Sequence, residues 1–118
     1  MAFDIAVKRV YEPAEASDGQ RVLVDRLWPR GVSKEKAELT LWLKGIAPSN
    51  ELRHWYNHDP ERWEEFRRRY AKELDGNPEP LRELGALLEH GRVTLLYSTQ
   101  EERYNNAVAL VAYLKENE

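Results

Sequence analysis

The chain has 118 residues, 42% of them hydrophobic and 33% charged, which is the size and composition of one globular domain. Eighteen Lys and Arg against 21 Asp and Glu give a formal charge of −3, which argues against a protein that coats nucleic acid. There is no cysteine, so disulfides, thiolate metal sites and cysteine nucleophiles are excluded.

The beginning of the sequence has an acid where a secretion signal has cations, and no apolar run reaches the roughly 18 residues of a membrane helix. We therefore expect a cytoplasmic protein, a single domain over residues 1–118, without membrane association or a bound cofactor. The sequence leaves open a homo-oligomer.

Strands and helices are predicted to alternate along the chain. Runs of β-branched and apolar residues predict strands at 5–10, 21–28, 39–43 and 92–98. Helices are predicted from N-caps at Ser33 and Ser49, from Asp59-Pro60, over 81–90, and from a Thr-x-x-Glu capping box at 99–102. This alternation is typical of parallel sheets, so we predict an α/β fold: one three-layer domain with a mostly parallel sheet of about four strands flanked by helices.

The densest group of polar residues lies in the segment VLVDRLWPRG, residues 22–31. Open α/β sheets bind ligands at the carboxyl ends of their strands, and that edge is predicted to gather Arg9, Asp25, Arg26, Trp28, Arg30, Ser98 and Thr99. Asp25 needs a partner there, because an unpaired charge near the core is costly. Either Asp25 and Arg26 form a structural ion pair, or the arginines bind an oxyanion that Asp25 helps to orient or deprotonate.

A second prediction concerns the place where an anion would bind. Residues 21–36 carry five cations against two acids. Arg30, Gly31, Lys34 and the backbone N–H groups after Ser33 form a predicted anion cradle, because helix N-termini attract negative charge. The predicted helix at 99–102 already carries its own acids, so we expect the anion at Ser33. The alternative is that the lysines simply point into water.

We also predict roles for the histidines and aromatic residues near this edge. His54 and His58 have a spacing that suits zinc, but Trp55 occupies the position of the catalytic glutamate, so no metal site is predicted. We assign His58 a hydrogen-bonding or general-base role at the rim of a pocket. Trp28 and Tyr97 are assigned as pocket walls, with core packing as the alternative for the indole. Ser98 lacks the flanking glycines of a nucleophile elbow, so it is assigned to ligand binding.

The sequence resembles a known family in five ordered motifs, from about Lys8 to Leu114. They are KRVYEP (8–13), VLVDRLWPRG (22–31), LWLKGIAPS (41–49), HDPERWEEFRRRY (58–70) and VTLLYS (93–98). Together they resemble the YeaO-like family of small bacterial and archaeal domains of unknown function, which implies a compact α/β domain. More distant relatives carry a cysteine after the last strand and a Cys-His pair downstream. Those positions here are Tyr97 and Asn105-Asn106, so the resemblance implies no thiol chemistry in this chain.

Two functional hypotheses follow. In the first, the carboxyl edge binds a small phosphate- or carboxylate-bearing ligand, with hydrolase- or transferase-type chemistry as an extension in which Asp25 and His58 are catalytic. In the second, the chain is a non-catalytic binding module for a protein or nucleic acid, although the negative charge argues against nucleic acid. A concave site lined by Arg26 and Arg30 favours the first hypothesis, and a flat face favours the second.

Overall fold

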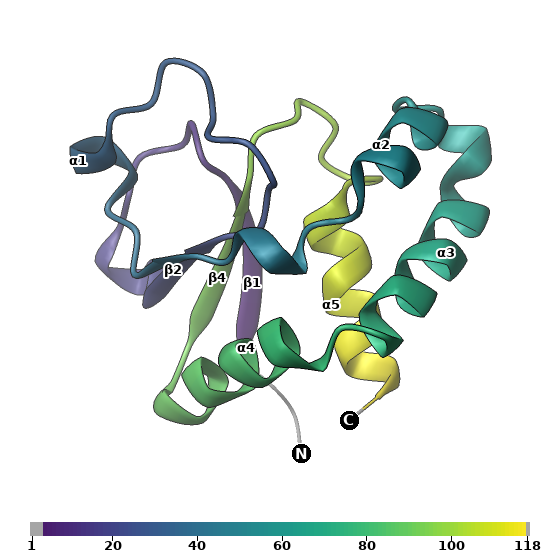
Figure 1. The fold of residues 1–118 in the computed structure, drawn as a ribbon. Coiled ribbons are helices and arrows are strands. Elements are labelled where there is room, and N and C mark those ends of the chain that lie inside the picture. The colour runs from purple at the N-terminus through teal and green to yellow at the C-terminus, as the bar shows by residue number, and fades with distance from the viewer. Residues whose placement is uncertain (1–3, 118) are drawn as a thin grey trace.

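The predicted strands form one parallel sheet in the order β1–β4–β2–β3 (Figure 1). The computed structural model describes residues 4–117, and its strands are β1 (Ile5–Arg9), β2 (Gln20–Leu23), β3 (Leu41–Trp42) and β4 (Val93–Tyr97). Every residue of β4 is buried, as expected for an apolar strand between two parallel neighbours. The predicted α/β fold with a parallel four-stranded sheet is confirmed.

Five α-helices lie within the described residues: α1 (Lys34–Ala37), α2 (Asn50–Tyr56), α3 (Trp63–Asp75), α4 (Pro78–His90) and α5 (Asn106–Glu116). Short 3-10 turns occur at Ala16–Asp18, Lys44–Ile46 and Pro60–Arg62. The hydroxyls of Ser33 and Ser49 accept backbone N–H bonds in the first turns of α1 and α2, so both predicted N-caps are confirmed. Each helix in residues 4–117 is too short or too polar to cross a bilayer.

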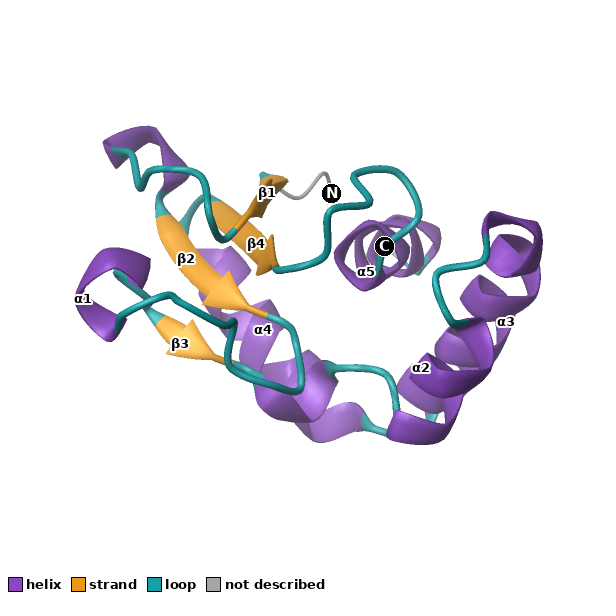
Figure 2. Ribbon diagram, turned by 90° about the horizontal axis from the view of Figure 1, so that it is seen from above, coloured by secondary structure: helices purple, strands orange, loops and turns teal. Residues whose placement is uncertain are grey.

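The two faces of the sheet are covered differently, as the view down its upper edge in Figure 2 helps to show. On one face, Val22 and Leu95 belong to the larger core, to which α2, α3, α4 and α5 contribute. On the other face, Leu23 and Leu96 contact Trp28 in a smaller core. The longer helices thus share one side, and loops with the short α1 form the third layer.

The final helix begins at Asn106, so the predicted capping box at 99–102 is wrong. The Thr99 hydroxyl accepts the N–H of Glu101, and the Glu101 carboxylate accepts the N–H groups of residues 103–104. In a capping box the Glu102 side chain would also accept the N–H of Thr99, and no such bond is formed among the described residues, so these bonds stabilise a loop. The cap is Asn105, whose side-chain oxygen accepts the N–H of Val108 at 2.9 Å.

Strand β2 ends at Leu23, earlier than the predicted residue 28. The indole of Trp42 donates to the carbonyl of Asp25 at 2.7 Å, and the indole of Trp28 donates to the carbonyl of Val32 at 2.7 Å. An indole therefore satisfies the Asp25 carbonyl, which lies within the predicted strand, and another holds the loop that follows. The third strand is likewise shorter than predicted, with only Leu41 and Trp42.

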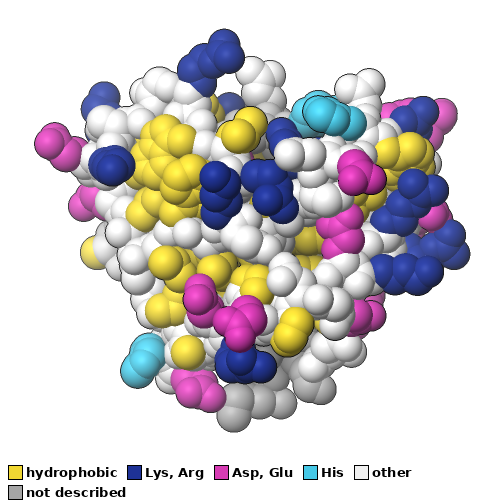
Figure 3. All heavy atoms as spheres, viewed as in Figure 1, with side chains coloured by type: hydrophobic (Ala, Val, Ile, Leu, Met, Phe, Trp, Pro, Cys, Tyr) yellow, Lys and Arg dark blue, Asp and Glu magenta, His cyan; other side chains and the backbone are white. Residues whose placement is uncertain are grey.

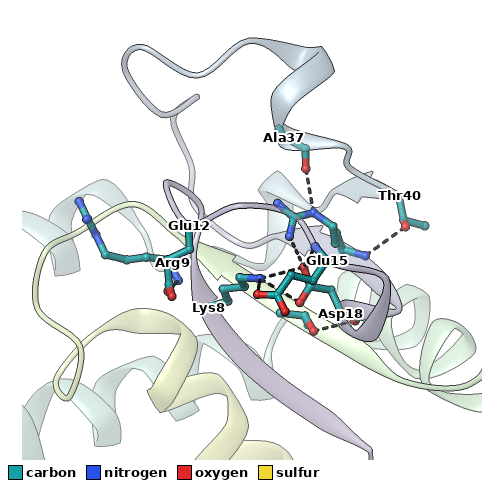
Figure 4. Close-up of polar contacts among 9 residues, drawn as sticks. Lys8, Arg9, Glu12, Glu15, Asp18, Ala37 and Thr40 are labelled. Carbon is teal, nitrogen blue, oxygen red and sulfur yellow. Dashed lines mark hydrogen bonds and ion pairs between the residues drawn. The ribbon is translucent and has the colours of Figure 1, made fainter.

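A buried ionic cluster joins the sheet to the layer of loops (Figure 4). Arg21 on β2 pairs with Asp18 at 2.5 Å and donates from Nε to the carbonyl of Ala37 at the end of α1. Lys8 on β1 contacts Asp18 at 3.1 Å and Glu15 at 3.2 Å. One carboxylate thus links two non-adjacent strands, while Arg21 reaches α1.

The ionisation of Asp18 is coupled to folding. Burial opposes the charged carboxylate, but the backbone N–H of Glu15 and the side chains of Lys8 and Arg21 outweigh it, so the pKa of Asp18 is lowered. Because the folded-state pKa is depressed, the stabilisation is present above the ordinary aspartate value. It is lost as the pH falls through the folded-state pKa.

The substitution Asp18→Asn is expected to lower the free energy of unfolding at neutral pH by about 3 kcal/mol, because Arg21 and Lys8 lose a buried counter-charge. The difference from the wild type should shrink below about pH 4, where aspartate begins to protonate. Urea unfolding at several pH values measures both effects. Glu15→Gln is the matched control: it removes the exposed partner of the same lysine and should cost about 0–1 kcal/mol. Equal costs for the two variants would contradict a buried cluster centred on Asp18.

Candidate functional site

A pocket of about 480 Å³ lies at the carboxyl edge of the sheet, which is the upper edge in Figure 1. It is lined by residues of the loop after β2, of α2 and of the segment between β4 and α5. Six of the predicted site residues line it, namely Asp25, Arg26, Trp28, Arg30, His58 and Ser98. The structure therefore brings together the predicted carboxylate, two of the predicted arginines and the predicted histidine.

Asp25 is held by neutral donors. Its Oδ2 accepts the Ser98 hydroxyl at 2.7 Å and the Ser98 backbone N–H at 2.9 Å. Its Oδ1 accepts the side-chain amide of Asn106 at 3.1 Å, and the same amide donates to the carbonyl of Val24 at 3.0 Å. This carboxylate joins the ends of two neighbouring strands to the start of α5.

The predicted ion pair between Asp25 and Arg26 is not formed. The Arg26 guanidinium turns to the segment before α2, where Nε donates to the carbonyl of Pro48 at 3.2 Å and Nη2 to that of Ala47 at 3.1 Å. Carbonyl oxygens accept hydrogen bonds but carry no formal charge. Arg26 therefore fixes the wall of the pocket while keeping its positive charge.

Arg9 has a similar supporting role outside the pocket lining. Its Nε donates to the carbonyl of Thr99 at 2.9 Å and its Nη2 to that of Ser98 at 3.3 Å. The guanidinium also lies 4.8 Å from the centre of the Tyr11 ring. Arg9 thus anchors the segment after β4 that presents Ser98 to the pocket.

The predicted anion cradle is divided by the fold. Arg30 lines the pocket, whereas Gly31, Ser33 and Lys34 lie outside its lining. The α1 helix has only four residues, and the Ser33 hydroxyl is occupied by the N–H of Lys36 at 3.1 Å. The helix whose first residue lines the pocket is α5, and its first turn carries no acid.

Aromatic rings form much of the pocket wall. Trp28 contributes as predicted, together with Tyr56, Phe66 and Tyr104. The Tyr56 hydroxyl donates to the carbonyl of Tyr104 at 2.8 Å, and burial raises the pKa of Tyr56 to about 12, so it remains a neutral donor. Tyr97, the other predicted wall, lies in the larger core outside the pocket lining, and burial raises its pKa.

Sequence reasoning assigned no site role to Arg53, Asn105 or Asn106, all of which line the pocket. Arg53 lies on α2 and donates to the side chain of Asn50 at 2.9 Å. The apolar stripe of α5 begins at Ala107, and an asparagine two residues earlier is a capping signal that would have located this helix start. For Arg53 we find no comparable signal, since its place depends on how α2 packs.

His54 and His58 both line the pocket. Asn57 and His58 have φ angles of 48° and 54°, so the α2 helix ends between the two histidines and they do not share one helical face. Among residues 4–117, no three His, Asp or Glu side chains are close enough to hold a metal ion. Both histidines thus line the pocket, on either side of the end of α2.

The charge of the lining is positive in a chain whose formal charge is −3. The lining contains three arginines, Arg26, Arg30 and Arg53, and one carboxylate, Asp25. In Figure 3, Lys and Arg side chains, a histidine and hydrophobic side chains lie next to one another over the loop after β2 and α2. The combination of cations with apolar walls is suited to an organic anion.

The substitution Asp25→Asn is expected to lower the free energy of unfolding by about 1–3 kcal/mol, because an amide NH₂ would face donors of Ser98 or Asn106. Ser98→Ala should cost about 1 kcal/mol, since it removes one of the hydrogen bonds. Denaturant unfolding of the double variant should show a cost smaller than the sum by at least about 0.5 kcal/mol. Additive costs would contradict the hydrogen-bonded group described here.

The comparisons with known proteins agree on one family. Over residues 4–118 the chain matches the family described as the inactive DUF488-N3 subclade. It is 44% identical over 110 residues to an uncharacterised protein of Mycobacterium tuberculosis (strain ATCC 25618 / H37Rv), covering 93% of this chain and 92% of that protein. It is 41% identical over 112 residues to the uncharacterised protein YeaO of Escherichia coli (strain K12), covering 95% of this chain and 97% of YeaO. No solved structure matches the chain. The family expected from the sequence motifs is confirmed, and the chain belongs to the YeaO-like proteins of the inactive DUF488-N3 subclade.

Proposed function

We propose that the pocket at the carboxyl edge of the sheet binds a small anionic molecule that bears a phosphate or a carboxylate. The observation that carries the proposal is that the arginines of the pocket, unlike most other arginines of the chain, have no carboxylate partner. Seven arginines of the described chain pair with carboxylates: Arg21, Arg62, Arg67, Arg68, Arg69, Arg82 and Arg92. Five arginines have no carboxylate partner among residues 4–117, and three of these, Arg26, Arg30 and Arg53, line the pocket, whereas Arg9 and Arg103 lie outside its lining.

The three pocket arginines retain hydrogen-bonding capacity. A guanidinium has five N–H donors, of which Arg26 uses two groups on backbone carbonyls and Arg53 uses one on Asn50. Arg30 is exposed, and none of its side-chain donors is engaged within the described residues. Phosphate and carboxylate oxygens suit this donor geometry, because arginine binds them with two parallel hydrogen bonds.

Concavity supports a small ligand over a macromolecular partner. A pocket of about 480 Å³ falls in the range of sites that enclose small molecules, roughly 300–1,000 Å³. Arg26 and Arg30 line this hollow and are not spread over a flat face.

The same contacts favour binding over catalysis. The Asp25 carboxylate is already engaged by three hydrogen bonds, and the Ser98 hydroxyl donates its hydrogen bond to that carboxylate. No hydrogen bond within residues 4–117 joins His58, the other residue predicted to be catalytic, to Asp25 or Ser98. The description of the matched family as inactive agrees with a binding role.

Isothermal titration with inorganic phosphate and with citrate tests the proposal. Arg30→Ala and Arg53→Ala should each raise the Kd about tenfold or more, because each removes a charge-assisted hydrogen bond. Arg82→Ala is the matched control: it removes the same charge from α4, outside the pocket lining, and should change the Kd less than about twofold.

Three outcomes would contradict the proposal. They are the absence of binding of both anions by the wild type, an equal loss in the Arg82→Ala control, and unfolding of both pocket variants in a thermal melt. Turnover of a phosphate monoester by the wild type would keep the binding site but overturn the non-catalytic role.

A further inference from the structure

We infer that the anion bound in this pocket carries a flat apolar ring beside its charged group. This inference rests on the proposed function and specifies the ligand further. A bare phosphate or a small sugar acid would use the arginines alone. The apolar side chains around them indicate that the ligand has a second, hydrophobic part.

The exposed apolar side chains are concentrated at the pocket. Among the described residues, the large hydrophobic side chains that are clearly exposed are Val7 at 37%, Tyr11 at 44% and Leu27 at 61%. Tyr11 and Leu27 both line the pocket, whereas Val7 lies on β1 outside it. Exposed apolar groups that gather around a concave site typically mark a place where a ligand removes them from water.

These apolar groups lie next to the cations. The Tyr11 hydroxyl donates to the carbonyl of Arg30 at 2.7 Å, which joins the ring to the loop that carries this arginine. Leu27 stands between Arg26 and Trp28 in the sequence, and all three side chains line the pocket. A ligand with its charge on Arg26 or Arg30 would therefore place its remaining atoms against Leu27, Trp28 or Tyr11.

The deeper wall is aromatic and has a fixed shape. The Tyr56 and Phe66 rings stack with centres 4.3 Å apart, and the Tyr56 hydroxyl is fixed to the carbonyl of Tyr104. Trp28, which also lines the pocket, packs edge-on against Trp42 with centres 5.4 Å apart and donates its N–H to the carbonyl of Val32. Tyr56 and Phe66 are buried, so the half-buried indole of Trp28 is the fixed ring among these that a ligand can contact. A rigid aromatic surface favours a planar ligand over a flexible chain, because little entropy is lost on contact.

A matched pair of phosphate monoesters tests the inference. Phenyl phosphate and methyl phosphate carry the same charged group, and only the first has a ring. By isothermal titration, the wild type should bind phenyl phosphate about tenfold more tightly than methyl phosphate. Leu27→Ala should reduce that ratio to about threefold or less without changing the Kd for methyl phosphate. Arg30→Ala should weaken both esters alike.

The control is Val7→Ala, which removes an exposed apolar side chain outside the pocket and should change neither Kd. Equal affinity of the wild type for the two esters would overturn the inference that the ligand carries a ring, but it would leave the proposed anion site in place. An equal effect of Val7→Ala and Leu27→Ala would also overturn it. If neither ester binds, the proposed function fails and the ring inference fails with it.

Discussion

The Asp25 carboxylate is the contact on which the geometry of the pocket depends. Parallel strands end at the same edge of a sheet, but nothing in strand pairing holds the loops that follow them in a defined position. Asp25 does this by accepting two bonds from Ser98 after β4 and one from Asn106 at the start of α5. All three donors are neutral, so these hydrogen bonds fix the carboxylate in place without an ion pair.

Backbone carbonyls are the second group of acceptors that hold the residues around the pocket in place. Arg9 and Arg26 bind four carbonyl oxygens, two after β4 and two before α2. A carboxylate would hold a guanidinium equally well but would cancel its charge. The use of carbonyls therefore lets two arginines shape the walls while the surroundings of the pocket remain positive, which is the electrostatic basis of the proposed anion site.

Much of the fold can be predicted from local signals, because caps and apolar strands act over short stretches. The N-caps at Ser33 and Ser49 and the buried run of β4 are of this kind. The Thr-x-x-Glu pattern at 99–102 misleads because Thr99 and the neighbouring Glu101 stabilise a loop instead. The correct start of α5 is carried by Asn105, where a cap and an apolar stripe coincide.

The site is only partly predictable for a different reason. Asp25, Arg26, Arg30 and Ser98 follow strands, so the sheet itself brings them together. Arg53 depends on tertiary contacts that position α2, among them the bond from the Ser49 hydroxyl to Glu73 on α3 at 2.6 Å. No pattern near Arg53 encodes that contact. Of the two residues that bind the Asp25 carboxylate, Ser98 follows β4, whereas Asn106 is placed by where α5 begins.

The buried guanidinium of Arg21 has a consequence for how this sequence changes over evolutionary time. It reaches Asp18 with one nitrogen and the end of α1 with another, and its remaining nitrogen, Nη2, is buried without a partner among the described residues. Lysine has a single nitrogen and cannot reach both directions. An apolar residue would leave Asp18 with Lys8 as its only cation. A lone substitution at position 18 or 21 therefore leaves a buried charge without its partner, and we expect related sequences to replace the two residues together.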